Sequence, residues 1–251
     1  MKLGILACDH VRPALQPRFG DYVDMFKAPL QRHIPNLQLV TYRLCDGNFP
    51  DRVTDCDAYI STGSRQSVYS DIDWVRQFSA LVVELATNNL PFVGICFGHQ
   101  MLAQALGGRV ERATVGWGVG ISTARILQAT SWMATDPSTA TPDYRLIISH
   151  QDQITSLPDA TTVLAGNDFC PFGMIQVGQN MLGIQGHPEF SKDYSRELMM
   201  IRRDKLGLKK FQNGIQSLNL ELDADRIFSW ISYFLLSHCE ERFNTHSSIG
   251  L

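Results

Sequence analysis

The sequence predicts an α/β protein built around a mainly parallel sheet. Short apolar runs alternate with segments of helical character in the N-terminal part of the chain, which is the pattern of βαβ units. The clearest helix lies at about 72–88, where apolar residues recur at helical spacing. A cysteine between two glycines follows the apolar run at 90–95 and precedes another helical pattern. These observations place loops at the strand ends, where such sheets carry their sites.

The predicted elements follow in order along the chain. Strands are expected at 2–7, 37–43, 57–61 and 90–95. The helix at 72–88 has an apolar stripe formed by Trp74, Val75, Phe78, Leu81, Val82 and Leu85. Asp71 is placed to cap the start of this helix. A second helix is expected after Cys96, and Gly107 and Gly108 supply its stop.

Beyond Gly108 the pattern changes to shorter β-rich pieces. They lie at 109–126, 144–149, 161–166 and 173–186, and the last contains a hairpin with its turn at 178–180. From about residue 191 the chain is predicted to be helical, with segments near 191–206 and 224–242. The second segment carries the aromatic residues Phe228, Trp230, Tyr233 and Phe234. Either these residues dock on the main core or they form a subunit contact, and both interpretations stay open.

Composition and charge argue against several classes of function. A formal net charge of -3 leaves no electrostatic footprint for nucleic acid or an anionic membrane. Lys205, Lys209 and Lys210 form one cluster, which we interpret as a solvated helix end. The apolar stretch at 227–236 is shorter than the roughly 20 residues that span a bilayer. The N-terminal apolar run is expected to be a buried strand rather than a signal peptide. Six cysteines without a C-x-x-C pair favour a reducing cytoplasm.

Cys96 is the candidate nucleophile. It lies between Gly94 and Gly98 in GICFGHQ, at a strand-to-helix turn where the backbone is strained and its neighbours must lack bulk. On local grounds, a buried cysteine packed between glycines is an equal alternative. Cys8 also ends a predicted strand, but no orienting group follows it, so a structural role is favoured there.

A thiol attacks as the thiolate, so Cys96 needs a base. His187 ends a strand and is followed by Pro188 and Glu189. Proline keeps the residue before it extended, and residues two apart on an extended segment point the same way. Glu189 is therefore expected to orient the His187 ring and leave its other nitrogen for the thiol. The alternative for an isolated His-Pro-Glu is a surface turn.

Acyl transfer also needs hydrogen-bond donors for the developing oxyanion. The backbone N–H of Phe97, directly after the candidate nucleophile, is one candidate. The loop at 61–67 follows a predicted strand, and Gly63 brings a second N–H to the same region unless it forms a plain glycine turn.

The motifs GICFGHQ, HPE, STGS at 61–64 and SHQDQ at 149–153 together resemble a class I glutamine amidotransferase domain over roughly residues 1–195. The resemblance implies a flavodoxin-like, doubly wound, mainly parallel sheet with helices on both faces. Residues 196–251 are then a helical C-terminal extension packed on the same domain. No metal-ligand constellation stands out in the sequence, and we expect neither metal nor organic cofactor.

The resemblance also implies roles for particular residues. A catalytic triad would consist of Cys96, His187 and Glu189, and the oxyanion hole of Gly63 and Phe97. The amino and carboxylate groups of a glutamine-like substrate would be held by Gln100 and by the backbone around His150 and Gln151. The side chains of His99 and His150 are expected to be structural. Specificity would depend on Arg65, Tyr69 and Trp117, although each of them has an alternative as packing or solvated surface.

The reaction implied by the resemblance is hydrolysis of a γ-glutamyl amide through a thioester on Cys96. The chain has no Walker-type loop, so a glutaminase that feeds ammonia to a synthesis would need a separate synthetase. Alternatively, γ-glutamyl hydrolysis is itself the function. STGSRQSVYSD, the GWGVG segment at 116–120 and GIQGHPEF are similar to stand-alone members related to the guanosine monophosphate synthase glutaminase and to γ-glutamyl peptidases. A third hypothesis, a non-catalytic binding or regulatory module, is disfavoured by the intact triad.

Overall fold

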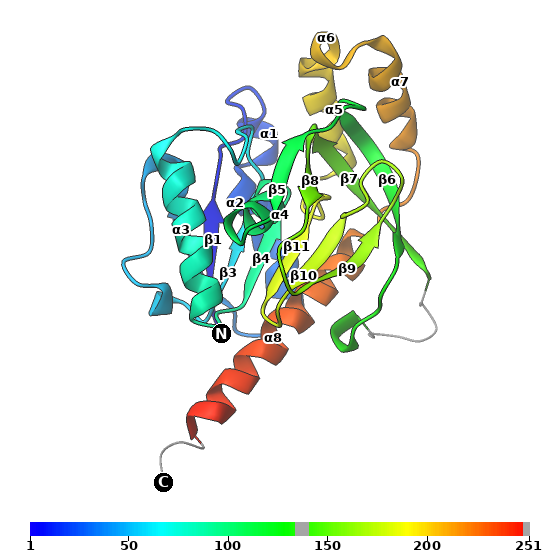
Figure 1. Ribbon diagram of the computed structural model, residues 1–251. Coiled ribbons are helices and arrows are strands. Elements are labelled where there is room, and N and C mark those ends of the chain that lie inside the picture. Colours follow the sequence, from blue (N-terminus) through cyan, green and yellow to red (C-terminus); the bar gives the residue numbers. More distant parts are fainter. Residues whose placement is uncertain (134–140, 248–251) are drawn as a thin grey trace.

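The computed structural model of the chain describes residues 1–133 and 141–247, with side chains described as far as Cys239. A mixed sheet of nine strands lies at the centre of the fold (Figure 1). Its strand order is β2-β1-β3-β4-β11-β10-β9-β6-β7. The parallel part comprises β2 (Gln38–Arg43), β1 (Lys2–Ala7), β3 (Ala58–Ser61), β4 (Phe92–Ile95) and β11 (Met181–Ile184). The antiparallel part comprises β10 (Met174–Val177), β9 (Thr161–Gly166), β6 (Gly118–Ile126) and β7 (Asp143–His150). A small separate sheet pairs β5 (Arg109–Arg112) with β8 (Asp152–Ser156).

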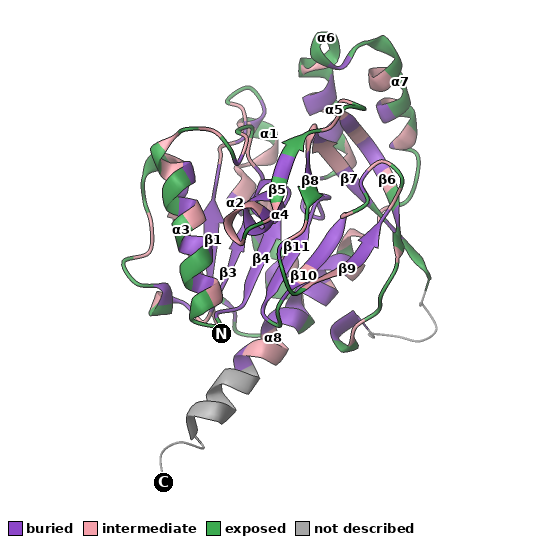
Figure 2. Ribbon diagram, in the orientation of Figure 1, coloured by how far each residue is buried: buried purple, intermediate pink, exposed green. Residues whose placement is uncertain are grey.

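Helices cover both faces of the central sheet, as predicted. On one face, α2 (Tyr22–His33) and α8 (Ala224–Ser247) bury their apolar residues in one cluster with Leu3, Ile5 and Val93 of the strands. On the other face, α3 (Asp73–Thr87) and α4 (Phe97–Ala105) pack against Tyr59 and Phe92. Figure 2 shows the central strands β1, β3, β4 and β11 as largely buried between these layers. The chain is therefore a doubly wound α/β protein.

A group of short helices lies beyond the ends of β6 and β7 (Figure 1). It consists of α5 (Lys192–Ile201), α6 (Arg203–Leu206) and α7 (Leu208–Ser217), while α1 (Gln16–Phe19) follows the first strand. The helices α5 and α7 pack on the antiparallel strands through a third apolar cluster that includes Ile121, Ile147 and Leu198. This packing brings the segment after residue 190 over the edge of the sheet that carries the candidate site.

The strands and helices expected in the N-terminal part are confirmed within a few residues, and so is the hairpin of β10 and β11. The capping role of Asp71 is wrong, because Ile72 is the N-cap residue of α3 and the Asp71 carboxylate bonds to Arg76 instead. The helix α7 and the strand β8 were not predicted. Their signals are weak because Gly214 is the buried residue of α7 and β8 alternates only briefly.

The aromatic residues of α8 separate into a buried set and one exposed member. Phe228, Trp230 and Phe234 lie in the core beside α2, whereas Tyr233 is 52% exposed. The docking interpretation of this helix is thus confirmed. The domain boundary at residue 195 stays a prediction, and α5 runs across it. Within the described ranges, no helix is long and apolar enough to cross a membrane.

Candidate active site

Cys96 occupies the sharp turn between β4 and α4. Its backbone has φ 52° and ψ -94°, a conformation that residues with side chains rarely adopt. A Cβ added at Gly94 would lie 2.4 Å from the backbone of Gly98, and one at Gly98 would lie 1.8 Å from the Ser61 hydroxyl oxygen. Both glycines are therefore required for the tight approach of helix and strand. The strained turn expected from the sequence is present.

His187 and Glu189 form a buried pair at the end of β11. The Nδ1 atom of His187 lies 2.7 Å from Oε1 of Glu189, and both side chains are almost inaccessible to solvent. The backbone N–H of His187 donates to the carbonyl of Ile147 on β7, and the Phe190 ring stacks on the imidazole at 3.9 Å between centroids. These contacts fix the ring in one orientation, so the pair is a rigid unit rather than a surface turn.

The electrostatics of His187 couple it to both neighbours. Burial by itself lowers the pKa of the imidazole, but the charges of Glu189 and of the Cys96 sulfur, with hydrogen bonds to both, raise that pKa well above its ordinary value. The ring carbon Cε1 of His187 also lies close to Gly63, where an added Cβ would come within 2.9 Å of it. The His187 imidazole is therefore coupled to the Glu189 carboxylate on one side and to the Cys96 sulfur on the other.

The two candidate oxyanion donors lie at this turn. The Cβ position of Gly63 is 3.5 Å from the Cβ of Cys96, and Phe97 is the first residue of α4. Because the first N–H groups of a helix have no intrahelical partner, the N–H of Phe97 is available to an anion at the sulfur. The structure thus brings Gly63, Cys96 and Phe97 together.

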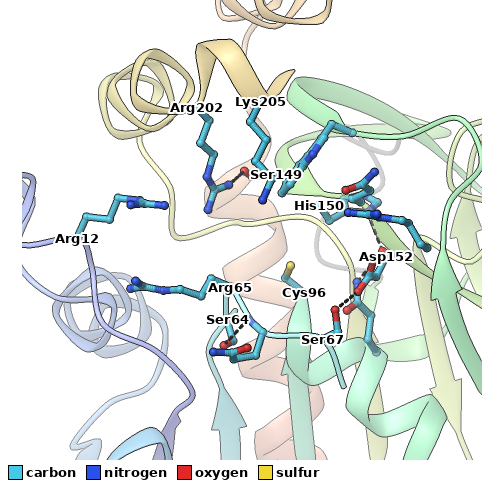
Figure 3. A pocket seen from close by; sticks show the side chains of 15 residues that line it. Arg12, Ser64, Arg65, Ser67, Cys96, Ser149, His150, Asp152, Arg202 and Lys205 are labelled. Carbon is cyan, nitrogen blue, oxygen red and sulfur yellow. Dashed lines mark hydrogen bonds between the residues drawn. The ribbon is translucent and has the colours of Figure 1, made fainter. Parts of the chain in front are cut away.

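A pocket of about 280 Å³ opens at Cys96 (Figure 3), and Gln100, His150 and Gln151, the candidate substrate-binding residues, are among those that line it. The amide nitrogen of Gln100 donates to the carbonyl of Asp152 at 2.7 Å and to Oε1 of Gln185 at 3.0 Å. His150 donates from Nδ1 to the same carbonyl at 3.1 Å. Burial lowers the pKa of His150 to about 4, so its ring is neutral at ordinary pH.

His99 has a different place. It is fully buried, its ring rests against Gly183, and burial lowers its pKa to about 3. Cys8 is buried as well, with its backbone N–H donating to the Thr62 hydroxyl, and burial raises the pKa of its thiol well above the ordinary value. A structural role fits each of these residues.

The three candidates for specificity differ in position. Arg65 and Trp117 line the pocket, and the Arg65 guanidinium is paired with Asp9 at 2.8 Å. Tyr69 instead donates its hydroxyl to the Asp152 carboxylate at 3.0 Å, and Ser67 donates to the same carboxylate. These bonds tie the loop after β3 to the start of β8.

Sequence reasoning missed four cationic residues that line the pocket, namely Arg12, Arg112, Arg202 and Lys205. Lys205 and Lys209 are exposed, as expected for a solvated helix end, whereas Lys210 is half-buried, and two of the three lysines also contact Trp117. The Lys205 ammonium lies 5.1 Å from the centroid of the Trp117 ring, and Lys210 donates to the Trp117 carbonyl at 3.1 Å. The clustering was visible in the sequence, but only the packing of α5 to α7 directs it toward the site.

A second polar cluster lies at the end of β1. His10 bonds through Nδ1 to Asp21 at 2.8 Å and through Nε2 to Asp46 at 3.0 Å, with Cys45 beside them. The hydrogen bond to Asp21 raises the pKa of His10. Because both ring nitrogens are already held by carboxylates, this cluster acts as an ion-pair network that fixes the loop carrying Arg12.

Comparison with known proteins gives consistent findings. The model of the family described as glutamine amidotransferase class I matches residues 27–203. The chain is 32% identical over 184 residues to γ-glutamyl peptidase 5 of Arabidopsis thaliana. The aligned region covers 72% of this chain and 72% of that protein. It is 30% identical over 159 residues to a component of the glutamine-hydrolysing GMP synthase of Halobacterium salinarum, covering 63% of this chain and 80% of the other.

The fold matches that of a solved glutamine amidotransferase from Thermotoga maritima. The TM-score is 0.70 at 19% identity, and the match covers 95% of this chain and 98% of the other.

Proposed function

Since the chain belongs to the class I glutamine amidotransferase family, we propose that it hydrolyses a γ-glutamyl amide bond through a thioester on Cys96. The observation that carries the proposal is the buried pair of His187 and Glu189 coupled to the strained Cys96 turn. A thiolate next to an imidazolium has the nucleophile and the proton donor that amide cleavage requires.

The proposed reaction has two halves. The Cys96 sulfur attacks the γ-carbonyl carbon, a C–S bond forms, and the N–H groups of Gly63 and Phe97 stabilise the oxyanion. The intermediate collapses with cleavage of the C–N bond, and His187 gives its proton to the departing nitrogen. Water then attacks the thioester, His187 takes its proton, and glutamate leaves as the thiolate re-forms. Glu189 keeps the imidazole oriented and stabilises its charged form.

The glutamyl group is assigned to the part of the pocket lined by Gln100, His150 and Gln151. The proposal draws support from the carbonyl of Asp152, which anchors both Gln100 and His150 and so keeps this wall of the pocket rigid. A rigid wall favours one position of the γ-carbonyl relative to the sulfur, which is what covalent catalysis needs.

We favour a stand-alone γ-glutamyl hydrolase over a glutaminase that supplies ammonia to a partner. The relative named γ-glutamyl peptidase 5 aligns over 72% of both chains, which supports this choice. The similarity to a GMP synthase component supports the second candidate, a glutaminase that works beside a synthetase. A non-catalytic module is disfavoured because a binding role has no need of the coupled pair at Cys96.

Labelling and turnover test the proposal. A glutamine-like electrophile should add its mass to Cys96, and the label should vanish in Cys96→Ala while persisting in the control variant Cys170→Ala, which lacks another buried thiol. Labelling that survives Cys96→Ala would reject the assignment. The purified chain should also hydrolyse γ-glutamyl dipeptides by itself. Glutaminase activity that appears only with an added synthetase would reject the stand-alone hypothesis in favour of the second candidate.

A further inference from the structure

The pocket at Cys96 carries an uneven distribution of charge. Five cationic side chains line it, Arg12, Arg65, Arg112, Arg202 and Lys205, against the single carboxylate of Asp152. Arg65 is neutralised by Asp9. Among the side chains described in 1–133 and 141–239, no ion pair involves the other four cations. The chain as a whole has a formal net charge of -3, so the excess of positive charge is a property of the pocket and not of the whole protein.

Three of these cations point to the same space. Figure 3 shows Arg12, Arg202 and Lys205 extending toward the region beside the Cys96 sulfur from two separate parts of the chain. Arg202 lies between α5 and α6, Lys205 lies within α6, and Arg12 lies in the loop after β1. The Trp117 ring lies beneath Arg202 and Lys205, at 5.4 and 5.1 Å from its centroid.

Arg202 is the best positioned of the three. It is half-buried, and its guanidinium donates to the Ser149 hydroxyl at 2.8 Å without a carboxylate neighbour in the described part of the chain. Burial, followed by the charge of Arg12, acts against its charged form and lowers its pKa. Neighbouring cations that are partly removed from water repel one another. A bound anion would supply the negative charge that offsets this repulsion.

Arg202 also lines the space next to His187, where the amine would depart in the proposed reaction. A small extension of about 20 Å³ beside the main pocket is lined by His187 and Gly63 together with Arg202. His187 delivers its proton to the leaving nitrogen, so the group attached to that nitrogen passes Arg202. The opposite part of the pocket, at Gln100, His150 and Asp152, holds the glutamyl group in the proposed function.

We propose that Arg12, Arg202 and Lys205 form an anion subsite that binds a carboxylate on the leaving-group side of the γ-glutamyl bond. The preferred substrate class is therefore a γ-glutamyl amino acid or peptide with a free carboxylate, rather than glutamine itself. The inference rests on the proposed function and adds the residues that select among γ-glutamyl compounds.

The test compares γ-glutamylglycine with γ-glutamylglycinamide, which differ in the charge of the leaving group and hardly in size. At low salt, the kcat/KM of the wild-type chain should be at least about tenfold higher for γ-glutamylglycine than for the amide. A factor of this order is what one charge-assisted hydrogen bond contributes. Added salt should reduce this preference because the three cations are at least partly accessible to solvent and are therefore screened. Equal rates for the two compounds in the wild type would overturn the inference.

The variant Arg12→Gln/Lys205→Gln removes two of the cations without disturbing the half-buried Arg202, and its preference for the acid should fall to about twofold or less. The control Arg203→Gln/Lys209→Gln loses the same charge from exposed positions outside the pocket lining and should keep the preference. A preference that survives the first variant would contradict the subsite. So would an equal loss with both compounds, because it would mean that the cations bind the glutamyl carboxylate.

The two levels of the proposal fail differently. Cleavage of γ-glutamylglycinamide that depends on Cys96 but shows no preference for the acid rejects the subsite and leaves the hydrolase intact. If neither compound nor glutamine is cleaved, the proposed function is rejected and the subsite with it.

Discussion

Gly63 lies so close to His187 that a Cβ at position 63 would come within 2.9 Å of the imidazole Cε1. The loop after β3 and the segment after β11 thus meet at a point with no room for a methyl group. The imidazole also stacks on Phe190, and this contact further limits how far the ring can move. The position of the ring relative to the Cys96 sulfur depends on this glycine.

The first prediction concerns this contact. Gly63→Ala should lower kcat/KM for a γ-glutamyl substrate by about 100-fold, since displacing a reacting group by about an ångström has an effect of that order. The fold should persist, because Gly63 does not have a positive φ. Steady-state kinetics and thermal unfolding measure the two effects. In the control Gly173→Ala the added methyl meets its nearest neighbour at 3.4 Å, so activity should change little. Near wild-type activity of Gly63→Ala would contradict the packing argument.

A second prediction concerns pH and Glu189. The pKa of His187 is raised in the folded protein, so the imidazolium, which protonates the leaving group in the proposed reaction, persists through neutral pH and is lost only as pH rises through the raised value. Glu189→Gln removes a charge that raises this pKa, and the alkaline limb of the kcat/KM profile should move to lower pH. The rate itself should fall by about 10²- to 10⁴-fold, as when other triad carboxylates are neutralised. An unmoved alkaline limb would show that Glu189 does not set the charge of the ring.

The third prediction concerns stability in acid. Burial lowers the pKa of His99 to about 3 and that of His150 to about 4, whereas both take up protons near pH 6.5 in the unfolded chain. Stability from their neutral forms is complete above pH 6.5 and is lost as pH falls below it, by up to about 1.4 kcal/mol per pH unit for each group.

Urea unfolding between pH 7 and pH 4.5 measures the effect. His99→Gln should reduce the pH slope by roughly one proton. The contribution of His187 has the opposite sign: it is fully present below pH 6.5 and is lost as pH rises through its raised pKa. A pH-independent midpoint would contradict the burial of His99 and His150.

The fourth prediction concerns the turn at Cys96. Gly98→Ala should destabilise the fold by about 1–3 kcal/mol because the new methyl overlaps the Ser61 hydroxyl. That hydroxyl makes no hydrogen bond to any described residue, so Ser61→Ala removes bulk without breaking one. The double variant should therefore recover part of the loss in a denaturation experiment. Strictly additive effects of the two substitutions would show that they do not meet.

The fifth prediction concerns α8. Phe234 is fully buried and Tyr233, its neighbour in sequence, is 52% exposed. Phe234→Ala should lower the free energy of unfolding by about 3–5 kcal/mol, and Tyr233→Ala by less than about 0.5 kcal/mol. Chemical denaturation of the two variants tests whether the helix is part of the core. A similar cost for both would indicate that Tyr233 is covered by a partner in solution.

The parts of the fold that were predictable are those with strong local signals. The run before Cys96 is apolar, so β4 was expected where it lies. The apolar residues from Trp74 to Leu85 recur at helical spacing, so α3 was expected as well. The helix α7 was missed because its place depends on the close approach of Gly214 to Val119, a contact between segments far apart in the sequence. Local periodicity carries no information about such a contact.

The sequence by itself was enough to predict the α/β class and to single out Cys96, His187 and Glu189 as candidate site residues. The glycine-flanked turn and the His-Pro-Glu spacing impose their geometry locally. Only the tertiary structure decided what surrounds them. The parallel neighbours β4 and β11 bring residues 96 and 187 to one edge of the sheet, and the packing of α5 to α7 turns Arg202 and Lys205 toward the same pocket. The sequence does not show which way a charged side chain points, because that depends on how the backbone folds. The group of cations that lines the pocket therefore follows from tertiary packing.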